Sequence, residues 1–362
     1  MNYKMNTINI IAIGDQHFKV DNIQIVDLFI EKITELVSKT NPDFVVLLGD
    51  LLDTHERLHT IPLNRAYKFI NNIRKISKTF VLVGNHDLIS NTSYLKDDHW
   101  LNAMKEWDNV TIVDKVILNK IKNRKFIFCP YVSPGRFEEA LSTLNSDNPI
   151  LNKEEKPLIF AHQEFFGCKM GAFNSIEGDK WESEWPNVIS GHIHLNQKPQ
   201  ENIYYPGSSI PVAFGETAKN IIALIKFIDN KDEYILEEIE LEIPKKHIIY
   251  TDTEKVSEIN IPDSEDTIKL SISGEYEEFK TFKGTVKYKE LTKKGVKIVF
   301  KQKRKEIKDK KEALMNTLEN NTNNFNDIIH QMVQNQKDSY LYEAYQLVVN
   351  SKEVNSDDIL FL

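Results

Sequence analysis

The stretch INIIAIGDQH, residues 8–17, decides the fold, because a β-branched apolar run ends at a glycine and gives way to polar side chains. The same pattern recurs at four later places: FVVLLGD at 44–50, FVLVGNHD at 80–87, LIFAH at 158–162 and VISGH at 188–192. Uninterrupted apolar runs are typical of strands buried on both faces of a sheet. We therefore predict a set of buried strands, each followed by a polar cluster.

Helical patterns separate the early strands. Within residues 22–38 and 62–77 the apolar side chains follow the spacing of one helix face, and Pro62 suits a first helical turn. Strand–helix–strand alternation predicts an α/β domain whose polar motifs gather where the strands end. Two later runs, NIIALIKFI at 220–228 and YILEEIELEI at 234–243, are interpreted as closing strands, so that the domain spans residues 1–243.

The chain beyond residue 243 predicts two further parts. PKKHIIYTD, residues 244–252, is interpreted as a linker, and residues 253–305 as a small α+β domain of strand, helix and strand. Residues 306–362 predict a helical tail, whose two short amphipathic helices either pack on the small domain or dock on a partner. The apolar stripes of these helices are Phe325, Ile328, Ile329, Met332 and Val333, then Leu341, Tyr342, Tyr345, Val348 and Val349.

The composition is that of a globular protein with several domains. A length of 362 residues favours two or three domains, and 41 % apolar residues can fill a large core. No apolar run approaches the roughly twenty residues of a membrane-spanning helix. The first residues lead straight into a polar motif, so we interpret them as a strand rather than a secretion signal. Two cysteines are too few for a disulfide framework, and we expect a soluble, intracellular protein.

Positive charge is concentrated in one region, although the net charge is -8. Residues 280–311 contain fourteen Lys or Arg and three acidic residues, a local excess of eleven positive charges. Such a run is as often a solvated surface as a binding site, but it is the region where attraction to phosphates would concentrate. Its candidate DNA-binding residues are Lys280, Lys283, Lys287, Lys289, Lys293 and Lys294.

The five polar clusters suggest a shared metal site. In an extended backbone His192 and His194 point the same way, because side chains alternate along a strand. Alone, this pair is more often two surface histidines, and each other cluster could be an ordinary turn. Five such clusters, each after a predicted strand, favour a common site.

The residue types in these clusters suit two divalent cations. Hydrolysis of a phosphodiester is slow because its charged oxygens repel an incoming hydroxide, and two cations about 4 Å apart clamp the phosphate and activate water. A bridging carboxylate reduces the repulsion between the cations. Imidazoles, amide oxygens and further carboxylates can hold each cation while leaving room for water and substrate.

The ordered motifs resemble the calcineurin-like metallophosphoesterase superfamily. They are Asp15-x-His17, Gly49-Asp50, Gly84-Asn85-His86-Asp87, His162 and Gly191-His192-x-His194. The resemblance implies an α/β fold, a two-sheet α/β sandwich, with a small cap domain and a helical tail. Within the superfamily the chain is similar to the nuclease subunit of the double-strand-break repair complex, called SbcD in bacteria and belonging to the meiotic-recombination-eleven family elsewhere, with bacteriophage relatives. The motifs cover residues 8–217, and the remainder is similar only in layout.

The resemblance implies a role for each motif residue. Asp50 would bridge the two cations, and His86 would orient the phosphate or protonate the leaving oxygen, with Asp87 holding the His86 tautomer. Asp53 would support His17 or be an ordinary helix-start acid, and His55 is given no role. The first cation would be held by Asp15, His17, Asp50 and His194, and the second by Asp50, Asn85, His162 and His192. A turn at Gly207-Ser208 resembles a family loop beside the first cation.

The family resemblance favours a nuclease over other phosphoesterases. The stretches GDLLDTHE and GNHDLI depart from the patterns of protein phosphatases of this superfamily. A DNA nuclease of this type would act as a 3′-to-5′ exonuclease and as an endonuclease on single strands and hairpins. A standalone phosphodiesterase or nucleotidase for small substrates, and a non-catalytic DNA-end tether, remain the alternatives.

The resemblance also implies cofactors and partners. The cofactors would be two divalent ions, with Mn²⁺ favoured, although the ligand types suit iron, zinc and magnesium as well. The partners would be DNA, an SMC-like ATPase of the SbcC type bound by the tail, and a second copy of the chain. The richness in Lys, Asn and Ile indicates an AT-rich genome, and the short chain a phage or virus. Expected locations are the cytoplasm or nucleoid, or a nucleus or viral factory.

Overall fold

The computed structural model describes residues 7–55, 57–144, 156–171, 173–215, 219–228 and 233–303, together with Val333, Tyr342 and Tyr345. The chain divides into two units between residues 302 and 303. The first unit contains both the predicted phosphoesterase domain and the predicted cap domain. The two amphipathic helices expected in the tail lie outside the described residues, so that prediction stays open.

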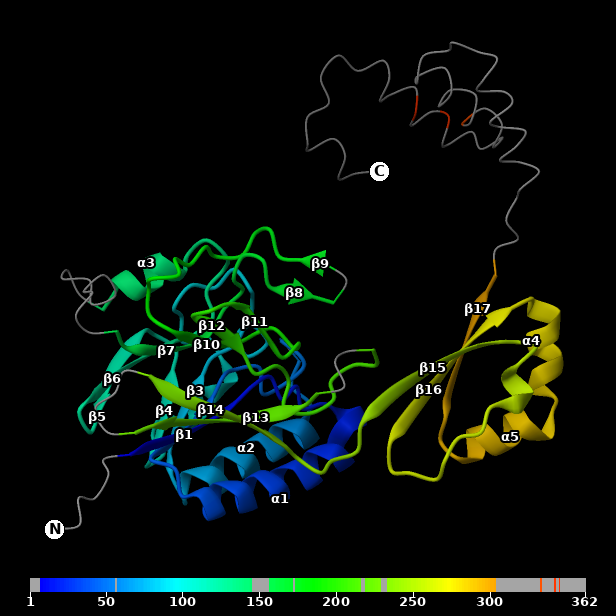
Figure 1. Ribbon diagram of the computed structural model, residues 1–362, viewed down its shortest axis with the longest axis horizontal. Helices are drawn as coiled ribbons and strands as arrows, with labels where there is room; N and C mark the ends of the chain where they lie inside the picture. The colour runs from blue at the N-terminus through cyan, green and yellow to red at the C-terminus, as the bar shows by residue number, and fades with distance from the viewer. Residues whose placement is uncertain are drawn as a thin grey trace. The chain divides into compact units, whose positions relative to one another are not determined.

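The first sheet is built around parallel strands and is closed by two antiparallel ones (Figure 1). Its order is β14-β13-β1-β2-β3-β4. The closing strands are those expected from the runs after residue 219. The strands are β1 (Ile8–Ile13), β2 (Phe44–Leu47), β3 (Lys78–Leu82), β4 (Val110–Val113), β13 (Ile221–Phe227) and β14 (Tyr234–Glu240).

The second sheet has the order β11-β12-β10-β7-β6-β5, with its four central strands parallel. These strands contain the last two of the five predicted apolar runs. The strands are β5 (Ile117–Ile121), β6 (Arg124–Cys129), β7 (Leu158–His162), β10 (Val188–Gly191), β11 (Gln197–Gln200) and β12 (Ile203–Tyr205). A short hairpin of β8 (Lys169–Met170) and β9 (Phe173–Asn174) follows β7.

The two sheets pack face to face through an aromatic core. Phe80 and Phe128 stack with their ring centroids 4.0 Å apart, and Phe44 contacts both sheets through edge-to-face ring pairs. Aromatic pairs of this kind add stabilisation beyond the apolar area that they bury. The uninterrupted apolar runs are therefore explained, because each central strand is covered on both faces. The predicted two-sheet α/β sandwich is confirmed.

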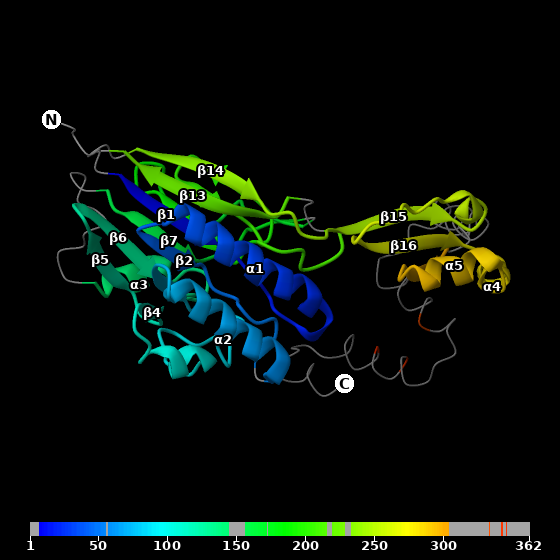
Figure 2. The same ribbon diagram turned by 90° about the horizontal axis from the view of Figure 1, so that it is seen from below.

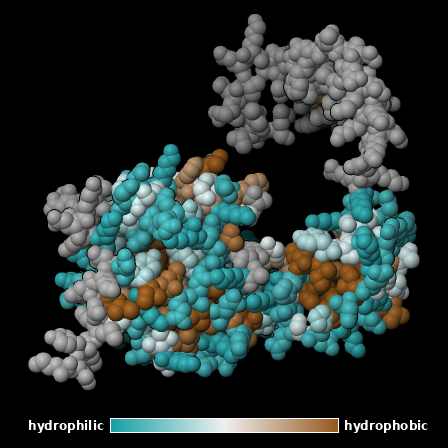
Figure 3. All heavy atoms as spheres, in the orientation of Figure 1, coloured by the Kyte–Doolittle hydropathy of each residue, from teal (hydrophilic) through white to brown (hydrophobic). Residues whose placement is uncertain are grey.

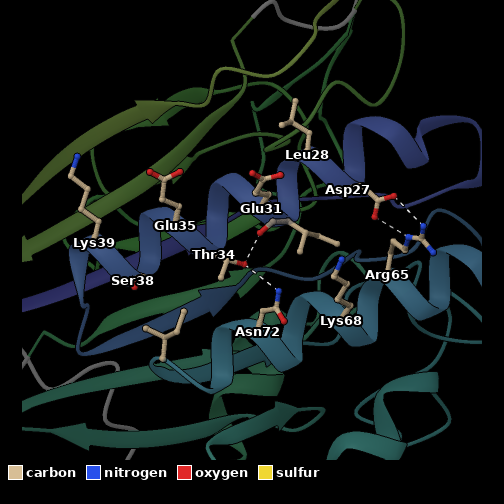
Figure 4. Close-up of a pocket in the computed structure, with 12 residues that line it drawn as sticks. Asp27, Leu28, Glu31, Thr34, Glu35, Ser38, Lys39, Arg65, Lys68 and Asn72 are labelled. Atoms are coloured by element: carbon tan, nitrogen blue, oxygen red, sulfur yellow. Dashed lines mark hydrogen bonds and ion pairs between the residues drawn. The ribbon is translucent and has the colours of Figure 1, made fainter.

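Helices α1 (Ile23–Thr40) and α2 (Thr60–Arg74) cover the outer face of the first sheet (Figure 2). Both helices match the predicted apolar spacing, and Pro62 lies in the first turn of α2. A polar groove of about 1120 Å³ separates them, crossed by an Arg65–Asp27 ion pair and a Thr34–Asn72 hydrogen bond (Figure 4). None of the residues lining this groove belongs to the motif clusters. The remaining elements of the large domain are α3 (Phe137–Ser142), η1 (Val20–Asn22) and η2 (Trp100–Met104).

The small domain begins earlier than expected. Residues 244–252 were interpreted as a linker, but Lys246–Asp252 forms strand β15, which pairs in parallel with β16 (Thr267–Gly274). The linker prediction is therefore wrong, because Ile249 packs against the core of this domain and the backbone of 246–252 is hydrogen-bonded to β16. Strand β17 (Lys297–Gln302) completes the parallel sheet, and the domain also contains η3 (Val256–Glu258), α4 (Tyr276–Lys283) and α5 (Val286–Lys293).

Candidate metal centre

The ends of four parallel strands, two from each sheet, bring the polar clusters together. Asp15 follows β1 and Asp50 follows β2, while His162 ends β7 and His192 follows β10. Parallel strands present their carboxyl ends at one edge of a sheet, and face-to-face packing places the two edges side by side. Asp15, Asp50 and His162 are at most 1 % exposed.

One group of donor atoms comes from Asp15, His17 and His194. Their ligand atoms all lie within 4.8 Å of one another. The Nε2 atoms of His17 and His194 are 3.0 Å apart, and Oδ2 of Asp15 is buried without a hydrogen-bond partner. An unpartnered buried carboxylate oxygen is costly, and a cation would satisfy it together with both imidazole nitrogens.

A second group comes from Asp50, His162 and His192, again within 4.8 Å. The side-chain oxygen of Asn85 lies 3.0 Å from Nε2 of His162 and 2.8 Å from Nδ1 of His192. The amide oxygen therefore completes a set of one carboxylate, two imidazoles and one carbonyl, which is the set that the sequence predicted for the second cation.

Asp50 lies between the two groups. Its Oδ2 atom is 3.5 Å from Nε2 of His17 and 3.3 Å from Nε2 of His162, so that one oxygen faces both groups. Burial acts to raise the pKa of Asp50, but the charge and hydrogen bond of His162, followed by the charges of His17 and His86, lower it far below its usual range. Burial acts to lower the pKa of His162, but the charge and hydrogen bond of Asp50, together with the charge of Asp15, outweigh burial and raise the pKa to about 9. This carboxylate is positioned to bridge two cations.

His86 borders both Asp50 and His17. Its backbone N–H donates to Oδ1 of Asp50 at 2.8 Å, and its Nδ1 atom lies 2.9 Å from the carbonyl oxygen of Asp53. A carbonyl oxygen can only accept a hydrogen bond, so Nδ1 carries the proton and donates it in this bond, and Nε2 is left to act on a substrate. A ligand atom of His86 also lies within 4.8 Å of those of His17 and Asp50, so distance alone would permit it to bind a cation.

Asp87 does not hold the His86 ring, contrary to the sequence expectation. Its Oδ2 accepts the backbone N–H groups of Gly84 and Asp50 at 3.0 and 2.9 Å, and its Oδ1 accepts the indole N–H of Trp100 at 2.9 Å. Burial, followed by the charge of Asp50, raises the pKa of Asp87 to about 6. Asp87 therefore fixes the loops that present the cluster, while the carbonyl of Asp53 sets the His86 tautomer.

The backbone at the cluster is strained. Asp15, His17, Asp50 and His192 all have a positive φ, of 37°, 43°, 52° and 81°. Non-glycine residues seldom adopt this region, and the cost is of order 1–3 kcal/mol for each residue. Strained residues of this kind cluster at functional sites, so four of them around one pocket support the assignment of the metal centre to this place.

The comparison with known families agrees with this geometry. The family model described as "Calcineurin-like phosphoesterase" matches residues 8–196, which include every motif of the cluster. The chain belongs to the calcineurin-like phosphoesterase family. The family binds divalent metals, and a donor set of carboxylates, imidazoles and one amide oxygen fits such ions.

Two viral proteins are similar to this phosphoesterase over most of their length. "Putative phosphoesterase 078R" of Invertebrate iridescent virus 3 is 44 % identical over 344 residues, covering 93 % of this chain and 95 % of that protein. "Putative phosphoesterase 244L" of Invertebrate iridescent virus 6 is 47 % identical over 282 residues, covering 77 % of this chain and 98 % of that protein. Both names describe a phosphoesterase, and neither specifies a substrate.

The structure described as "GAP50 the anchor in the inner membrane complex of Plasmodium" is 14 % identical, with a TM-score of 0.38. The match covers 65 % of this chain and 89 % of that protein's chain. That similarity is too low to carry an argument. Among the described residues of this phosphoesterase, the helices lack the length and apolarity needed to cross a bilayer.

Several residues that the sequence gave no firm role contribute to the centre. His55 stacks on His86 with ring centroids 4.4 Å apart, and Tyr131 packs 5.6 Å from His192. Oε2 of Glu164 lies 3.8 Å from Nε2 of His192. Asp53 lies 3.5 Å from Nδ1 of His17 as well as 3.2 Å from Lys19, and His17, then Lys19, lowers its pKa to about 2. The sequence carried no periodic pattern that could place these side chains.

The Gly207-Ser208 turn lies beside the first group, as the sequence suggested. The backbone N–H of Ser208 donates to the carbonyl of His194 at 3.1 Å, and Ser209 donates to Gly14 at 2.9 Å. Gly207 has a φ of 78°, and a Cβ there would lie 2.6 Å from the His194 carbonyl oxygen. Only glycine permits this close approach.

An open cleft of about 570 Å³ leads away from the centre of this phosphoesterase. It is lined by residues 169–171 of the β8–β9 hairpin, by 192–195, and by Phe214 and Gly215. The amino groups of three lysines lie over the Phe214 ring, at 5.8, 5.6 and 5.6 Å from its centroid. These are Lys246, Lys269 and Lys297 of the small domain, which we call the Phe214 lysines.

The Phe214 lysines differ from those singled out in the sequence. Lys269 pairs with Lys297 in register, and both alternate with Leu270 and Ile298, which pack under α4 and α5. Successive side chains of a strand point to opposite faces, so the Phe214 lysines occupy the sheet face away from the two helices. The predicted Lys280, Lys283, Lys287, Lys289 and Lys293 lie on α4 or α5, and Lys294 follows α5. Lys294 lies 2.6 Å from Asp263, and Lys280 lies 3.7 Å from Glu277.

Proposed function

We propose that this phosphoesterase is a two-cation DNA nuclease, with 3′-to-5′ exonuclease activity and endonuclease activity on single strands and hairpins. In this proposal it is the nuclease subunit of an SbcCD-like repair or recombination complex. The observation that supports a polynucleotide substrate is the cleft that runs from the metal centre to Phe214, over whose ring the Phe214 lysines lie.

The charge distribution along the cleft favours a polymer over a small phosphate ester. The negative charge of a phosphate at His192 and His194 would already be neutralised by the cations of the centre. Three further ammonium groups around Phe214 repel one another, and neighbouring phosphates of a nucleic acid strand would relieve that repulsion. A mononucleotide or a small diester has no second phosphodiester to place there.

The residues of the cluster have distinct tasks in this proposal. Asp15, His17, Asp50 and His194 would hold one cation, and Asp50, Asn85, His162 and His192 the other. Bound divalent cations supply Lewis-acid polarisation of the phosphate and an activated water. With Nδ1 donating to the Asp53 carbonyl, His86 keeps Nε2 available to orient the phosphate or, when protonated, to give a proton to the leaving oxygen.

The expected cofactor and partners form part of the same proposal. Mn²⁺ is the favoured ion by family resemblance, and iron, zinc and magnesium are to be compared with it, because mixed imidazole and carboxylate ligands alone do not select one metal. The partners are DNA, an SMC-like ATPase of the SbcC type bound through residues 306–362, and a second copy of the chain. Support for the last two comes from family resemblance.

The test is a nuclease assay of the purified full chain on linear duplex, single-stranded and hairpin DNA, with each divalent cation in turn. Bis(p-nitrophenyl) phosphate, a small diester, is assayed in parallel. We expect cleavage of DNA and of the small diester, and loss of both activities in Asp50→Ala. Hydrolysis of the small diester or of mononucleotides without any DNA cleavage would identify a small-substrate phosphoesterase. DNA binding without hydrolysis of any substrate would identify a tether.

A further inference from the structure

The β8–β9 hairpin exposes apolar side chains beside the metal centre. Phe173 is 77 % exposed and Ile176 is 80 % exposed, the two highest values among the large apolar side chains that the structure describes. Met170 of β8 is 41 % exposed, and Phe166, just before the hairpin, is 51 % exposed. Large apolar side chains exposed on one short segment contribute little to a core and are typical of an interaction site.

These exposed side chains lie on a segment that is itself held in place by buried residues and hydrogen bonds. Phe165 and Cys168 at its base are fully buried in the core behind the second sheet. Backbone hydrogen bonds join Phe166 to Asp179 at 2.9 Å and Ser175 to Cys168 at 2.8 Å. The side chain of Gln197 bonds both the N–H and the carbonyl of Lys169, at 2.8 and 2.9 Å. The apolar side chains therefore lie on an element that is fixed in position beside the cleft.

The hairpin is connected to the metal centre through one carboxylate. Oε1 of Glu164 accepts the Ser175 hydroxyl at 2.5 Å, and its Oε2 lies 3.8 Å from Nε2 of His192. The hairpin and the second group of donor atoms are thus fixed relative to each other. Whatever contacts the hairpin lies at a defined place next to the scissile phosphate.

One face of the hairpin looks into the cleft. Met170 lines the cleft together with His192 and His194. Phe173 is the cross-strand partner of Met170, and directly opposed residues of an antiparallel pair project from the same face. The large exposed ring of Phe173 therefore borders the space that a strand must cross to reach the centre.

The cleft limits what can enter it. A volume of about 570 Å³ lies within the range of small-molecule pockets, which is enough for a nucleotide or two and too small for a duplex. A strand that enters from a duplex end must leave its complement, and the exposed bases then lose stacking and pairing partners. Phe, Ile and Met are the side chain types that proteins insert between bases to stabilise an unstacked step.

We propose that the β8–β9 hairpin separates the strands of a duplex end, with Phe173 covering the base next to the scissile phosphate and Ile176 adding a second exposed apolar side chain just after the hairpin. This inference rests on the proposed nuclease function and specifies its substrate as a strand unpaired at the entrance of the cleft. Stacking of a base on an aromatic side chain does not depend on sequence, so the hairpin would act on any DNA end.

The experiment compares the full-length chain with the double variant Phe173→Ala/Ile176→Ala. Both side chains are largely exposed, so the variant should fold and melt as the unchanged protein does. Ile235→Ala, at a residue of β14 that is 54 % exposed, is the matched control. The substrates are a blunt duplex, the same duplex with a splayed end of a few unpaired nucleotides, and bis(p-nitrophenyl) phosphate.

We expect the double variant to cleave the blunt duplex about tenfold more slowly, in line with the loss of one or two base contacts. The splayed duplex and the small diester should be cleaved at rates within about twofold of the unchanged protein, as for Ile235→Ala. An equal loss on blunt and splayed duplexes would mean that the hairpin binds the strand without separating it, and would overturn the proposal.

Other outcomes would also overturn it. Unchanged cleavage of every DNA would show that the apolar surface serves another ligand, such as a protein partner. Slower hydrolysis of the small diester would show that the hairpin only supports His192. The proposed function fails in a different way, since the unchanged protein itself would then hydrolyse the small diester and leave DNA intact.

Discussion

The metal cluster and the cleft that leads away from it differ in the burial of their side chains and in the strain of their backbone. In the cluster Asp15, His17, Asp50 and His162 are buried, the backbone is strained at four residues, and Asp50 and Asp87 each contact several groups. Along the cleft the key side chains are exposed or half-buried, and the lysines and apolar residues come from separate elements. Figure 3 shows apolar and polar residues interspersed on one face of the molecule. The cluster should thus determine the chemistry, and the cleft the choice of substrate.

The largest effect is expected at the cluster, where Asp50→Ala removes the carboxylate shared by both groups. We predict a loss of at least about a thousandfold in kcat on DNA and on bis(p-nitrophenyl) phosphate alike, since both cations lose a ligand. Asp27→Ala removes an α1 carboxylate that pairs with Arg65 of α2, and it is the matched control. If Asp50→Ala retained activity on either substrate, the cluster would not be the reaction centre.

The next effect separates the ligands from the group that acts on the substrate. His86→Ala should lower kcat about a hundredfold, the size of a lost general acid or phosphate contact, while cation binding is retained. His55→Ala removes only the ring stacked on His86, so its effect should be several times smaller. Titration of Mn²⁺ into each variant, alongside kcat, distinguishes the roles. Loss of a cation in His86→Ala would make His86 a ligand.

A smaller and more selective effect is expected in the cleft. Lys269→Glu/Lys297→Glu should raise KM for DNA about tenfold and reduce the slope of log affinity against log salt by about 2, because two phosphate contacts are lost. Turnover of the small diester should not change. The matched control is Lys280→Glu/Lys283→Glu on α4, on the other face of the small domain. An equal effect of the control pair would move the DNA surface to the helices.

The sequence predictions were more accurate for the metal cluster than for the cleft. Strands, helices and clustered residues of the large domain were predicted, because buried strands are uninterrupted apolar runs and parallel strands end at one edge. The roles of Asp87 and His55 were not, since adjacency in sequence does not report where a turn directs a carboxylate or where a loop folds. Asp87 bonds the amides of its own turn instead of the neighbouring ring.

The small domain shows a second limit of sequence reasoning. The sequence PKKHIIYTD is interpreted as a linker, and only the pairing of residues 246–252 with residues 267–273 reveals strand β15. The Phe214 lysines come from three strands and lie far apart in sequence. Their common face depends on strand register, whereas Lys280 to Lys294 form a visible local run that is largely helical.

The smallest effect is expected at a histidine–carboxylate pair outside the cluster. Asp114 lies 3.4 Å from Nε2 of His99 and also contacts Lys105. Burial acts to raise its pKa, but the hydrogen bonds of His99 and Lys105 outweigh it and lower the pKa to about 2. A lowered carboxyl pKa adds stability above the unfolded value of 3.8, and that stability is lost as pH falls towards 2.

Asp114→Asn should therefore lower the free energy of unfolding by about 1 kcal/mol near neutral pH, after allowance for solvent screening. The difference from the unchanged protein should shrink as the pH is lowered below about 4. Urea unfolding at several pH values measures it. Addition of EDTA should leave this difference in place, and a change on chelation would couple the pair to the cluster.

The central claim is tested most directly by counting bound cations. The full chain, dialysed against Mn²⁺ and analysed by plasma mass spectrometry, should hold about two equivalents. Asp50→Asn, which keeps the shape of the side chain and removes its charge, should hold about one equivalent or fewer. One equivalent in the unchanged protein, or two retained in Asp50→Asn, would contradict a pair of cations bridged by Asp50.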